Sequence, residues 1–434
     1  MLLIYTHTIT VRIVYTFNLV FKTVLDVEYE LTSDLESYQN YNGNKFAYTT
    51  TDKSFGTHIL SSNLLFETTV NLALPEPSKL HNGFPIFFEA SFSSFIPYDV
   101  FATVFYFATR YEEYLQPQLD KHQRFQAEQS LFYKHNLLQK PFLNNLITDF
   151  EKTIFEKFNL KSKHKNNFNA VSTIDIDNAY AYAHKGFKRN IGGALKDVFH
   201  LNFKQLAARV KSNINDSDDP YNTFELIHDL HKQYKIPLNY FVLIGDYSNY
   251  DKNPNFENPN FRKLLNDLSE NHNMGLHPSY VCYNNLDKIE IEKKRLENII
   301  EKKVTAARCH FLRVKLPETY RAFINYGITD DYTMIYASQS GFRTGLCTPH
   351  QWFDLERNES TTLTIHTSAV MEGTLRDYNK LDAFEASHLI ENTITKIKQV
   401  NGEFVSVWHN DSFTKENYKW VTVYEEMLKT LNNQ

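Results

Sequence analysis

The stretch Val171-Ser-Thr-Ile-Asp-Ile-Asp-Asn178 has the apolar pattern of a buried strand and ends in two acidic residues. If the strand continues to its end, alternation places Asp175 and Asp177 on the same side. Adjacent carboxylates repel each other, so such a pair needs a cation or a shared proton. A helix N-cap or a turn is the alternative interpretation, because Asp and Asn favour both. Both interpretations stay open on this segment alone.

The residues after this stretch alternate between strand and helix patterns. Helices are predicted at 259–271 and 287–301. Strands that alternate with helices indicate parallel βαβ units and a barrel-like sheet, which makes the fold class α/β. The further strands are predicted at 237–245, 304–313, 332–336, 341–346, 361–367 and 403–409.

The residues before this stretch are organised differently. Short strand-like runs broken by prolines are followed by two helical patterns, at 98–116 and 142–158. The polar and basic segment 161–167 has the composition of a linker. We therefore predict a smaller α+β domain of unassigned role at 1–160 and a second domain at 165–434.

Charge and cysteine content narrow the class of protein. The chain has 46 Lys and Arg against 51 Asp and Glu, a net charge of −5, so no basic excess indicates a nucleic-acid partner. Three cysteines in 434 residues exclude a disulfide scaffold and are typical of a reducing compartment. The N-terminus lacks a signal-peptide pattern, and charged residues interrupt the longest apolar runs. We therefore expect a cytoplasmic protein without a transmembrane segment.

Polar residues also follow three other predicted strands, and in a βα barrel the active residues lie at the carboxyl ends of strands. His277 ends a short Met-Gly-Leu run, where a neutral imidazole suits a borderline metal such as zinc. Arg308 and His310 would share one side of the strand at 304–313, and His409 ends the last strand. For a single histidine, a hydrogen bond in a turn is the commoner explanation, so each signal is weak by itself.

The order Asp-x-Asp, His, Arg-x-His and Trp-His is more specific than any of its parts. It resembles the order in the polysaccharide deacetylase superfamily, the NodB-like carbohydrate esterases, over residues 165–434. The motif Ser340-Gly-Phe-Arg343-Thr-Gly, with Cys347-Thr-Pro349, is similar to the signature of a branch with an extra N-terminal domain. The resemblance implies a deformed (β/α) barrel of about seven strands. It also implies that a divalent metal and water remove acetyl groups from amino sugars.

The resemblance further implies a role for each matching residue. Asp175 would be the catalytic base, held by Arg308, and His409 would protonate the departing amine. Asp177 and His277 would bind the metal, which would be zinc or another divalent ion. The side chains expected to contact the substrate are Tyr280, Arg343 and Trp408.

Two departures from the family pattern affect this assignment. Ile176 separates the two acidic residues, which are adjacent in the common family motif. Val281 stands four positions after the metal-binding histidine, where the family has a second histidine. Because catalytic zinc sites usually keep three protein ligands, we predict that His310 supplies the third.

The function expected from these residues is that of a metal-dependent hydrolase that removes acetyl groups from an amino sugar or glycan precursor. The alternative is a non-catalytic carbohydrate-binding or assembly protein, which Val281 favours. A third possibility is hydrolysis of a different C–N bond, as in cyclic amides. The N-terminal domain would recruit a partner or cover the site, and its residues do not distinguish the two roles.

Overall fold

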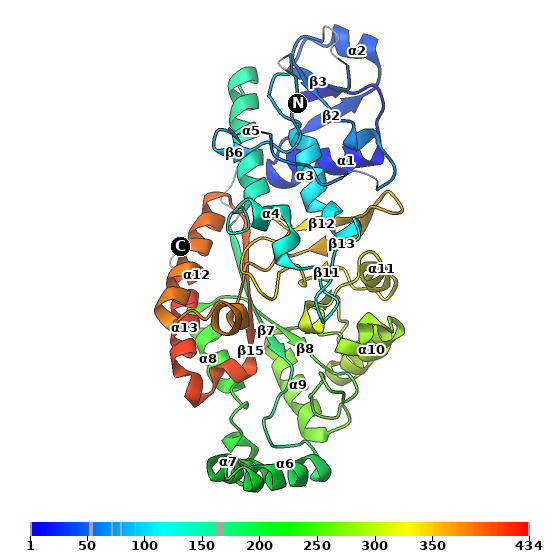
Figure 1. Ribbon diagram of the computed structural model, residues 1–434. Coiled ribbons are helices and arrows are strands. Elements are labelled where there is room, and N and C mark those ends of the chain that lie inside the picture. The colour runs from blue at the N-terminus through cyan, green and yellow to red at the C-terminus, as the bar shows by residue number, and fades with distance from the viewer. Residues whose placement is uncertain are drawn as a thin grey trace.

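Two lobes with separate sheets make up the described part of the chain (Figure 1). The computed structural model describes residues 2–51, 55–70, 73–78, 80–91, 93–160 and 168–432. The predicted linker at 161–167 lies outside these residues, so the predicted boundary between domains at 1–160 and 165–434 stays a prediction.

The N-terminal lobe contains a four-stranded sheet in the order β2-β1-β3-β4, and its strands run parallel. With helices between β1, β2 and β3, this arrangement is α/β, whereas the sequence predicted α+β. Apolar patterns identify strands but do not show which strands pair, and pairing sets their direction. The elements of this lobe are β1 (Leu2–Tyr5), α1 (Val11–Phe17), β2 (Tyr29–Thr32), α2 (Leu35–Asn40), β3 (Lys45–Thr49), β4 (His58–Leu60), β5 (Leu80–His81), β6 (Phe84–Pro85), α3 (Val100–Ala108), α4 (Leu131–Lys134) and α5 (Phe142–Phe158).

The C-terminal lobe contains a nine-stranded sheet in the order β12-β13-β11-β10-β9-β8-β7-β15-β14. Neighbouring strands from β13 to β14 are parallel, and β12 pairs with β13 in the antiparallel direction. The carboxyl ends of the parallel strands therefore meet at one edge. The strands are β7 (Asn169–Ile176), β8 (Leu238–Val242), β9 (Asn273–Leu276), β10 (Ala306–Ala307), β11 (Asp330–Asp331), β12 (His350–Asp354), β13 (Glu359–Ile365), β14 (Val370–Met371) and β15 (Glu403–His409).

Helices connect these strands, and α9 shows how the sequence sets their bounds. Asn258 accepts hydrogen bonds from the backbone of Asn260 and Phe261, and Pro259 occupies the first turn. The helix predicted at 259–271 is thereby confirmed. None of the helices within the described ranges combines the length and apolarity that a membrane span requires. The helices of this lobe are α6 (Phe187–Phe199), α7 (Phe203–Ile214), α8 (Phe224–Tyr234), α9 (Pro259–Asn271), α10 (Asp287–Ile300), α11 (Glu318–Asn325), α12 (Ala383–Gln399) and α13 (Tyr418–Asn432).

The predicted barrel is not confirmed, because the sheet is curved but open. Among the described residues, no strand ladder joins β14 to β12 or β13. Between β11 and β15, the ring of His366 bonds to Asp330 (3.2 Å) and Glu403 (2.6 Å). One imidazole thus links two strands that are not neighbours in the sheet. A sequence pattern counts strands, but it does not show whether the first and last ones pair.

The strand predicted at 304–313 is also shorter than expected. β10 ends at Ala307, and residues His310–Leu312 form a 3-10 turn in which Phe311 has a φ of 59°. Arg308 and His310 therefore do not share one face of a strand. The apolar run has a strand-like composition, but the tertiary structure bends it inward at the carboxyl edge of the sheet.

Candidate metal centre

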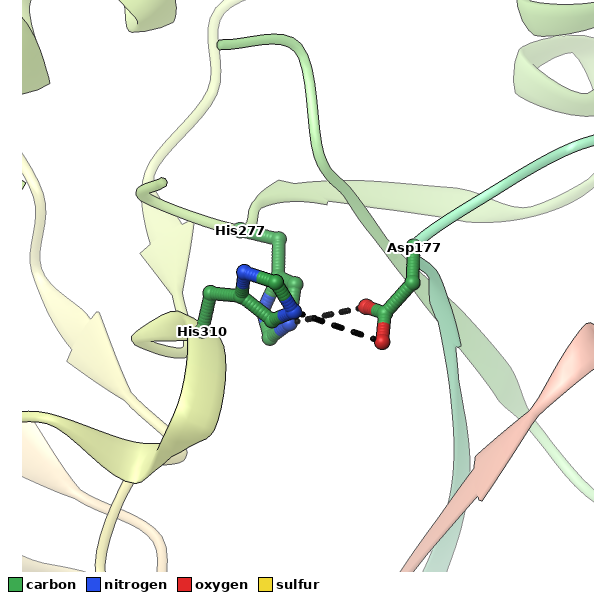
Figure 2. A group of neighbouring side chains, drawn as sticks. All are labelled: Asp177, His277 and His310. Atoms are coloured by element: carbon green, nitrogen blue, oxygen red, sulfur yellow. Dashed lines mark ion pairs between the residues drawn. The ribbon is translucent and has the colours of Figure 1, made fainter. Parts of the chain in front are cut away.

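Three side chains from separate segments meet at the carboxyl edge of the large sheet (Figure 2). Asp177 directly follows β7, His277 directly follows β9, and His310 begins the turn after β10. The Nε2 atom of His277 lies 3.2 Å from Oδ1 of Asp177, and that of His310 lies 3.4 Å from Oδ2. One donor atom from each residue lies within 4.8 Å of the other two. We call these three residues the metal group.

Hydrogen bonds behind the two imidazoles orient them toward Asp177. Nδ1 of His277 donates to the backbone carbonyl of Arg308 at 2.5 Å, and Nδ1 of His310 donates to Asp251 at 2.9 Å. In both rings Nε2 is therefore the nitrogen that faces the carboxylate. A second hydrogen bond of this kind is the usual support of a metal-binding histidine. Asp251 was not predicted, because it lies in a polar loop with no strand-end signal.

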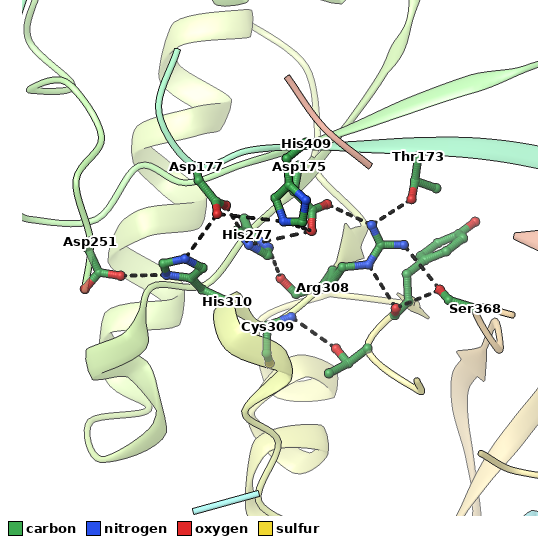
Figure 3. Close-up of polar contacts among 12 residues, drawn as sticks. Thr173, Asp175, Asp177, Asp251, His277, Arg308, Cys309, His310, Ser368 and His409 are labelled. Atoms are coloured by element: carbon green, nitrogen blue, oxygen red, sulfur yellow. Dashed lines mark hydrogen bonds and ion pairs between the residues drawn. The ribbon is translucent and has the colours of Figure 1, made fainter. Parts of the chain in front are cut away.

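Arg308 holds Asp175 at the same carboxyl edge of the sheet (Figure 3). Nη1 of Arg308 donates to Oδ1 of Asp175 and to Oγ1 of Thr173, both at 2.7 Å. The guanidinium is fully buried and lies over the Phe241 ring, 4.5 Å from its centroid. The other carboxylate oxygen of Asp175 lies 3.8 Å from Nε2 of His277. Arg308 thus fixes one oxygen of Asp175 and leaves the second directed at the metal group.

His409 approaches the two acids from the end of β15. Its Nε2 lies 3.8 Å from Asp177 and 4.0 Å from Asp175. Its Nδ1 donates to Glu372 at 2.7 Å, which orients the ring. Burial lowers the pKa of His409, but the nearby carboxylates, Glu372 foremost, outweigh burial and raise it well above the ordinary value. Glu372 is buried beside β14, a strand of two residues that the sequence analysis did not find.

Neighbouring charges strongly shift the pKa values of Asp177 and His310. Burial raises the pKa of Asp177, but His310 and His277 outweigh it and hold this pKa well below its usual range. Burial lowers the pKa of His310, but Asp177 and Asp251 outweigh it and raise the pKa to about 9. A divalent ion that binds His310 must displace a proton from its ring, so the affinity for the ion should rise with pH.

The chemistry of the donor set fits a divalent metal. Two imidazole nitrogens and one carboxylate oxygen are a common ligand set for catalytic zinc, and imidazole also suits iron, nickel and copper. Val281, four positions after His277, lies in the 3-10 turn Tyr280–Tyr283. The structure brings His310 to the group instead, from the turn after β10.

A cavity of about 180 Å³ opens over the metal group, and both lobes line it. Arg124 belongs to the N-terminal lobe and forms part of the wall. Its guanidinium donates to the carbonyl of Phe311 at 3.1 Å and pairs with Asp120 at 2.7 Å. The N-terminal lobe therefore borders the site directly.

The three side chains predicted to contact the substrate have other surroundings. Trp408 is 1% exposed and packs on Tyr424 in the core, which does not support the predicted contact. Arg343 is buried in an ion pair with Glu113 of the N-terminal lobe at 2.7 Å. Tyr280 stacks on Tyr250 and lies under the Arg313 guanidinium, so little of its ring is left for a sugar. Both faces of β15 are buried along most of its length, so strand alternation does not show which of its side chains face the site.

A family model described as "Family of unknown function (DUF7033)" matches residues 2–159. No curated protein matches the chain.

Solved structures of polysaccharide deacetylases are similar to this chain at low identity. The polysaccharide deacetylase of Bacillus cereus is 14% identical, with 61% of this chain and 86% of that chain covered and a TM-score of 0.30. A Mycobacterium smegmatis protein described as a polysaccharide deacetylase is 11% identical, with 63% and 87% covered and a TM-score of 0.42. The Xyl-CE4 domain of a multidomain xylanase from the hindgut metagenome of Trinervitermes trinervoides is 12% identical, with 62% and 85% covered and a TM-score of 0.30.

Proposed function

We propose that this protein is a metal-dependent hydrolase that removes an acetyl group from an amino sugar or a glycan precursor. The observation that carries the proposal is that the metal group, Asp175 and His409 lie together at one edge of the sheet. Each of these two carboxylates and three imidazoles lies within 4.0 Å of another of the five. Asp175 and the three histidines are each oriented by a further hydrogen bond from outside this cluster. The order of these residues along the chain is also the one that resembles the deacetylase superfamily.

Asp177, His277 and His310 would hold the metal. A bound divalent ion lowers the pKa of a water molecule and stabilises negative charge on an acyl oxygen. The remaining residues have to move protons and hold groups in place.

Asp175 is the better candidate for the general base. Arg308 binds one of its oxygens at 2.7 Å, and the other oxygen faces the imidazoles. A carboxylate held in this way can accept the proton of the attacking water while its orientation stays fixed. Asp177 is less suited to this role, because both of its oxygens face metal-group histidines.

His409 is the candidate general acid. Glu372 keeps Nδ1 engaged and favours the protonated ring, so Nε2 can donate a proton toward the centre of the site. In the overall reaction, water adds to the acyl carbon, the C–N bond breaks, and the amine leaves with the proton from His409. Acetate is the second product.

The cavity wall also suggests a role for the N-terminal lobe. Because Arg124 lines the cavity over the metal group, this lobe would cover one side of the bound substrate. Recruitment of a partner is not needed to explain its position.

The test is a measurement of bound metal and of acetate release from N-acetylated amino-sugar oligomers by the full chain. We expect Asp175→Asn to keep the metal and to lose acetate release, because the base is removed while the ligands remain. His388→Gln, an exposed histidine change on α12, should alter neither.

A non-catalytic carbohydrate-binding protein is the competing function, and Val281 is the residue that favours it. Metal-loaded protein that binds the oligomers but releases no acetate from any of them would support that function and contradict ours.

A further inference from the structure

Helices α6 and α7 form a hairpin at the end of the molecule opposite the N-terminal lobe (Figure 1). Residues 177–186 connect the hairpin to the carboxyl end of β7. Polar contacts join the two helices: Nε of Arg209 pairs with Asp197 at 2.9 Å, and Asn190 donates to Asn213 at 2.9 Å. The inner faces of the hairpin are therefore polar.

Its apolar side chains point outward instead. Of the 24 large apolar side chains that are exposed in the described residues, nine lie between positions 187 and 214. The only buried residues of the two helices are Asp197 and Ser212. This is the reverse of an ordinary surface helix, which buries its apolar stripe. The exposed residues are Phe187, Ile191, Leu195, Val198, Phe199, Leu201, Phe203, Val210 and Ile214.

The spacing of these residues makes continuous stripes. On α6 they recur at positions 187, 191, 195 and 199, which lie on one face of a helix. Phe187 and Phe199 are 80% and 84% exposed, so the stripe is open at both ends. An apolar surface of this extent is a binding site or an aggregation hazard.

The hairpin is also strongly basic in a protein that is acidic overall. Residues 185–214 contain seven Lys and Arg and one acidic residue, Asp197, whereas the whole chain has a net charge of −5. Asp197 is already paired with Arg209. Lys204 pairs with Glu416 at 3.4 Å, and the exposed Lys188 and Lys196 lie on α6, which carries the exposed apolar stripe. The basic residues are Lys185, Lys188, Arg189, Lys196, Lys204, Arg209 and Lys211.

We propose that the α6–α7 hairpin docks this protein on the surface of a membrane that contains anionic lipids. Apolar side chains flanked by Lys and Arg are the features of helices that lie in the plane of a membrane interface. Both helices are far shorter than the roughly 20 residues of a membrane span, so the hairpin lies on the bilayer. Charge complementarity selects this partner over a second copy, because two copies would bring their cations together.

The test is flotation of the full chain with vesicles of phosphatidylcholine alone or of equal parts phosphatidylcholine and phosphatidylglycerol. We expect binding to the mixed vesicles at low ionic strength and loss of binding at high salt. Leu195→Ser combined with Phe199→Ser should weaken binding by about a hundredfold, because both exposed side chains would insert. Phe384→Ser, an equally exposed change on α12, is the matched control and should bind normally.

A charge variant tests the second half of the proposal. Lys188→Glu combined with Lys196→Glu should reduce binding to the mixed vesicles by about tenfold or more. Lys294→Glu on α10 is the control and should have no effect. Thermal unfolding of each variant checks that the exposed changes leave the fold intact.

Three outcomes would overturn the proposal. The first is no binding to the mixed vesicles at low salt, and the second is equal binding by the Leu195/Phe199 double variant. The third is that the native chain does not bind vesicles but forms a dimer in sedimentation velocity, whereas the double variant is a monomer. That result would assign the hairpin to a second copy.

Discussion

Two clusters of buried histidine and carboxylate lie in the same sheet, and they are built differently. In the metal group, two imidazoles direct Nε2 at one carboxylate over 3.2 and 3.4 Å, while their other nitrogens are held from behind. In the second cluster, both nitrogens of the His366 ring are hydrogen-bonded, one to Asp330 at 3.2 Å and the other to Glu403 at 2.6 Å. We call this cluster the His366 bridge.

The metal group is built as a binding site, whereas the His366 bridge is a structural link between strands. Donor atoms of the metal group converge on a common point, and a cavity opens above them. In the His366 bridge every nitrogen is already paired, and Tyr332 stacks on the ring at 4.4 Å. Burial and a shifted pKa occur in both clusters, so neither property identifies the functional site without geometry.

The largest effect is expected from removing a ligand of the metal group. His310→Ala should weaken zinc binding by more than about a hundredfold, because the remaining pair of ligands falls short of the usual three. Zinc competition with a chelating dye measures the change. His366→Ala should leave zinc affinity unaltered, and a His310 variant that keeps full zinc affinity would remove the distinction between the two clusters.

The next effect concerns proton donation rather than binding. His409→Gln should lower the rate of acetate release by about a hundredfold to ten-thousandfold, since it removes the general acid. Zinc content should stay unchanged, because His409 is outside the metal group. Steady-state kinetics and metal analysis on the same preparation distinguish this result from loss of a ligand.

A smaller effect on metal affinity is expected from changing Asp251, which lies behind the metal group. Asp251→Asn removes the charge that orients His310, and outer hydrogen-bond partners of this kind contribute about tenfold to a hundredfold to metal affinity. Calorimetric titration with zinc gives the value. An affinity equal to that of the native chain would show that the His310 ring keeps its orientation without Asp251.

The smallest effect is on stability alone. The partner carboxylates outweigh the burial of His366 and raise its pKa from 6.5 to about 9. Because the folded pKa lies above the unfolded one, the bridge stabilises the fold fully below pH 6.5. That stabilisation, about 2–3 kcal/mol, is lost as pH rises through the folded pKa.

Thermal unfolding measured from pH 6.5 to about pH 9, the unfolded and folded pKa values of His366, tests the His366 bridge. The melting temperature of the native chain should fall as the solution becomes alkaline, and that of His366→Gln should start lower and change less. Parallel curves for the two proteins would contradict the assignment. His388→Gln, an exposed change on α12, serves as the control.

Much of the fold was predictable where local patterns agree with the final packing. The strand ending in Asp175, the helix at 259–271 and the strand at 403–409 correspond to β7, α9 and β15. Strong apolar periodicity and clear end signals explain these cases. The strand predicted at 304–313 was wrong beyond Ala307, because a composition typical of strands does not show where a chain leaves its sheet.

The partners of the site residues were less predictable. Asp251 and Glu372 come from a polar loop and from the end of a two-residue strand, so nothing in their local sequence distinguishes them. Trp408 and Arg343 were predicted at the site, but their contacts lie in the core and between the lobes. These contacts depend on which segments pack together over long sequence distances.

The sequence by itself determined which residue types stand at the ends of the strands, because the alternation of apolar side chains is a local property. From it came the acids at the carboxyl end of β7, the histidine after β9 and the histidine that ends β15. His310 was also predicted as a ligand, but only the tertiary structure shows that it reaches Asp177 and His277 from a turn and not from a strand. The tertiary structure also decided that the sheet stays open and that α6 and α7 face outward with their apolar sides. Each depends on contacts between distant segments, for which a local pattern holds no information.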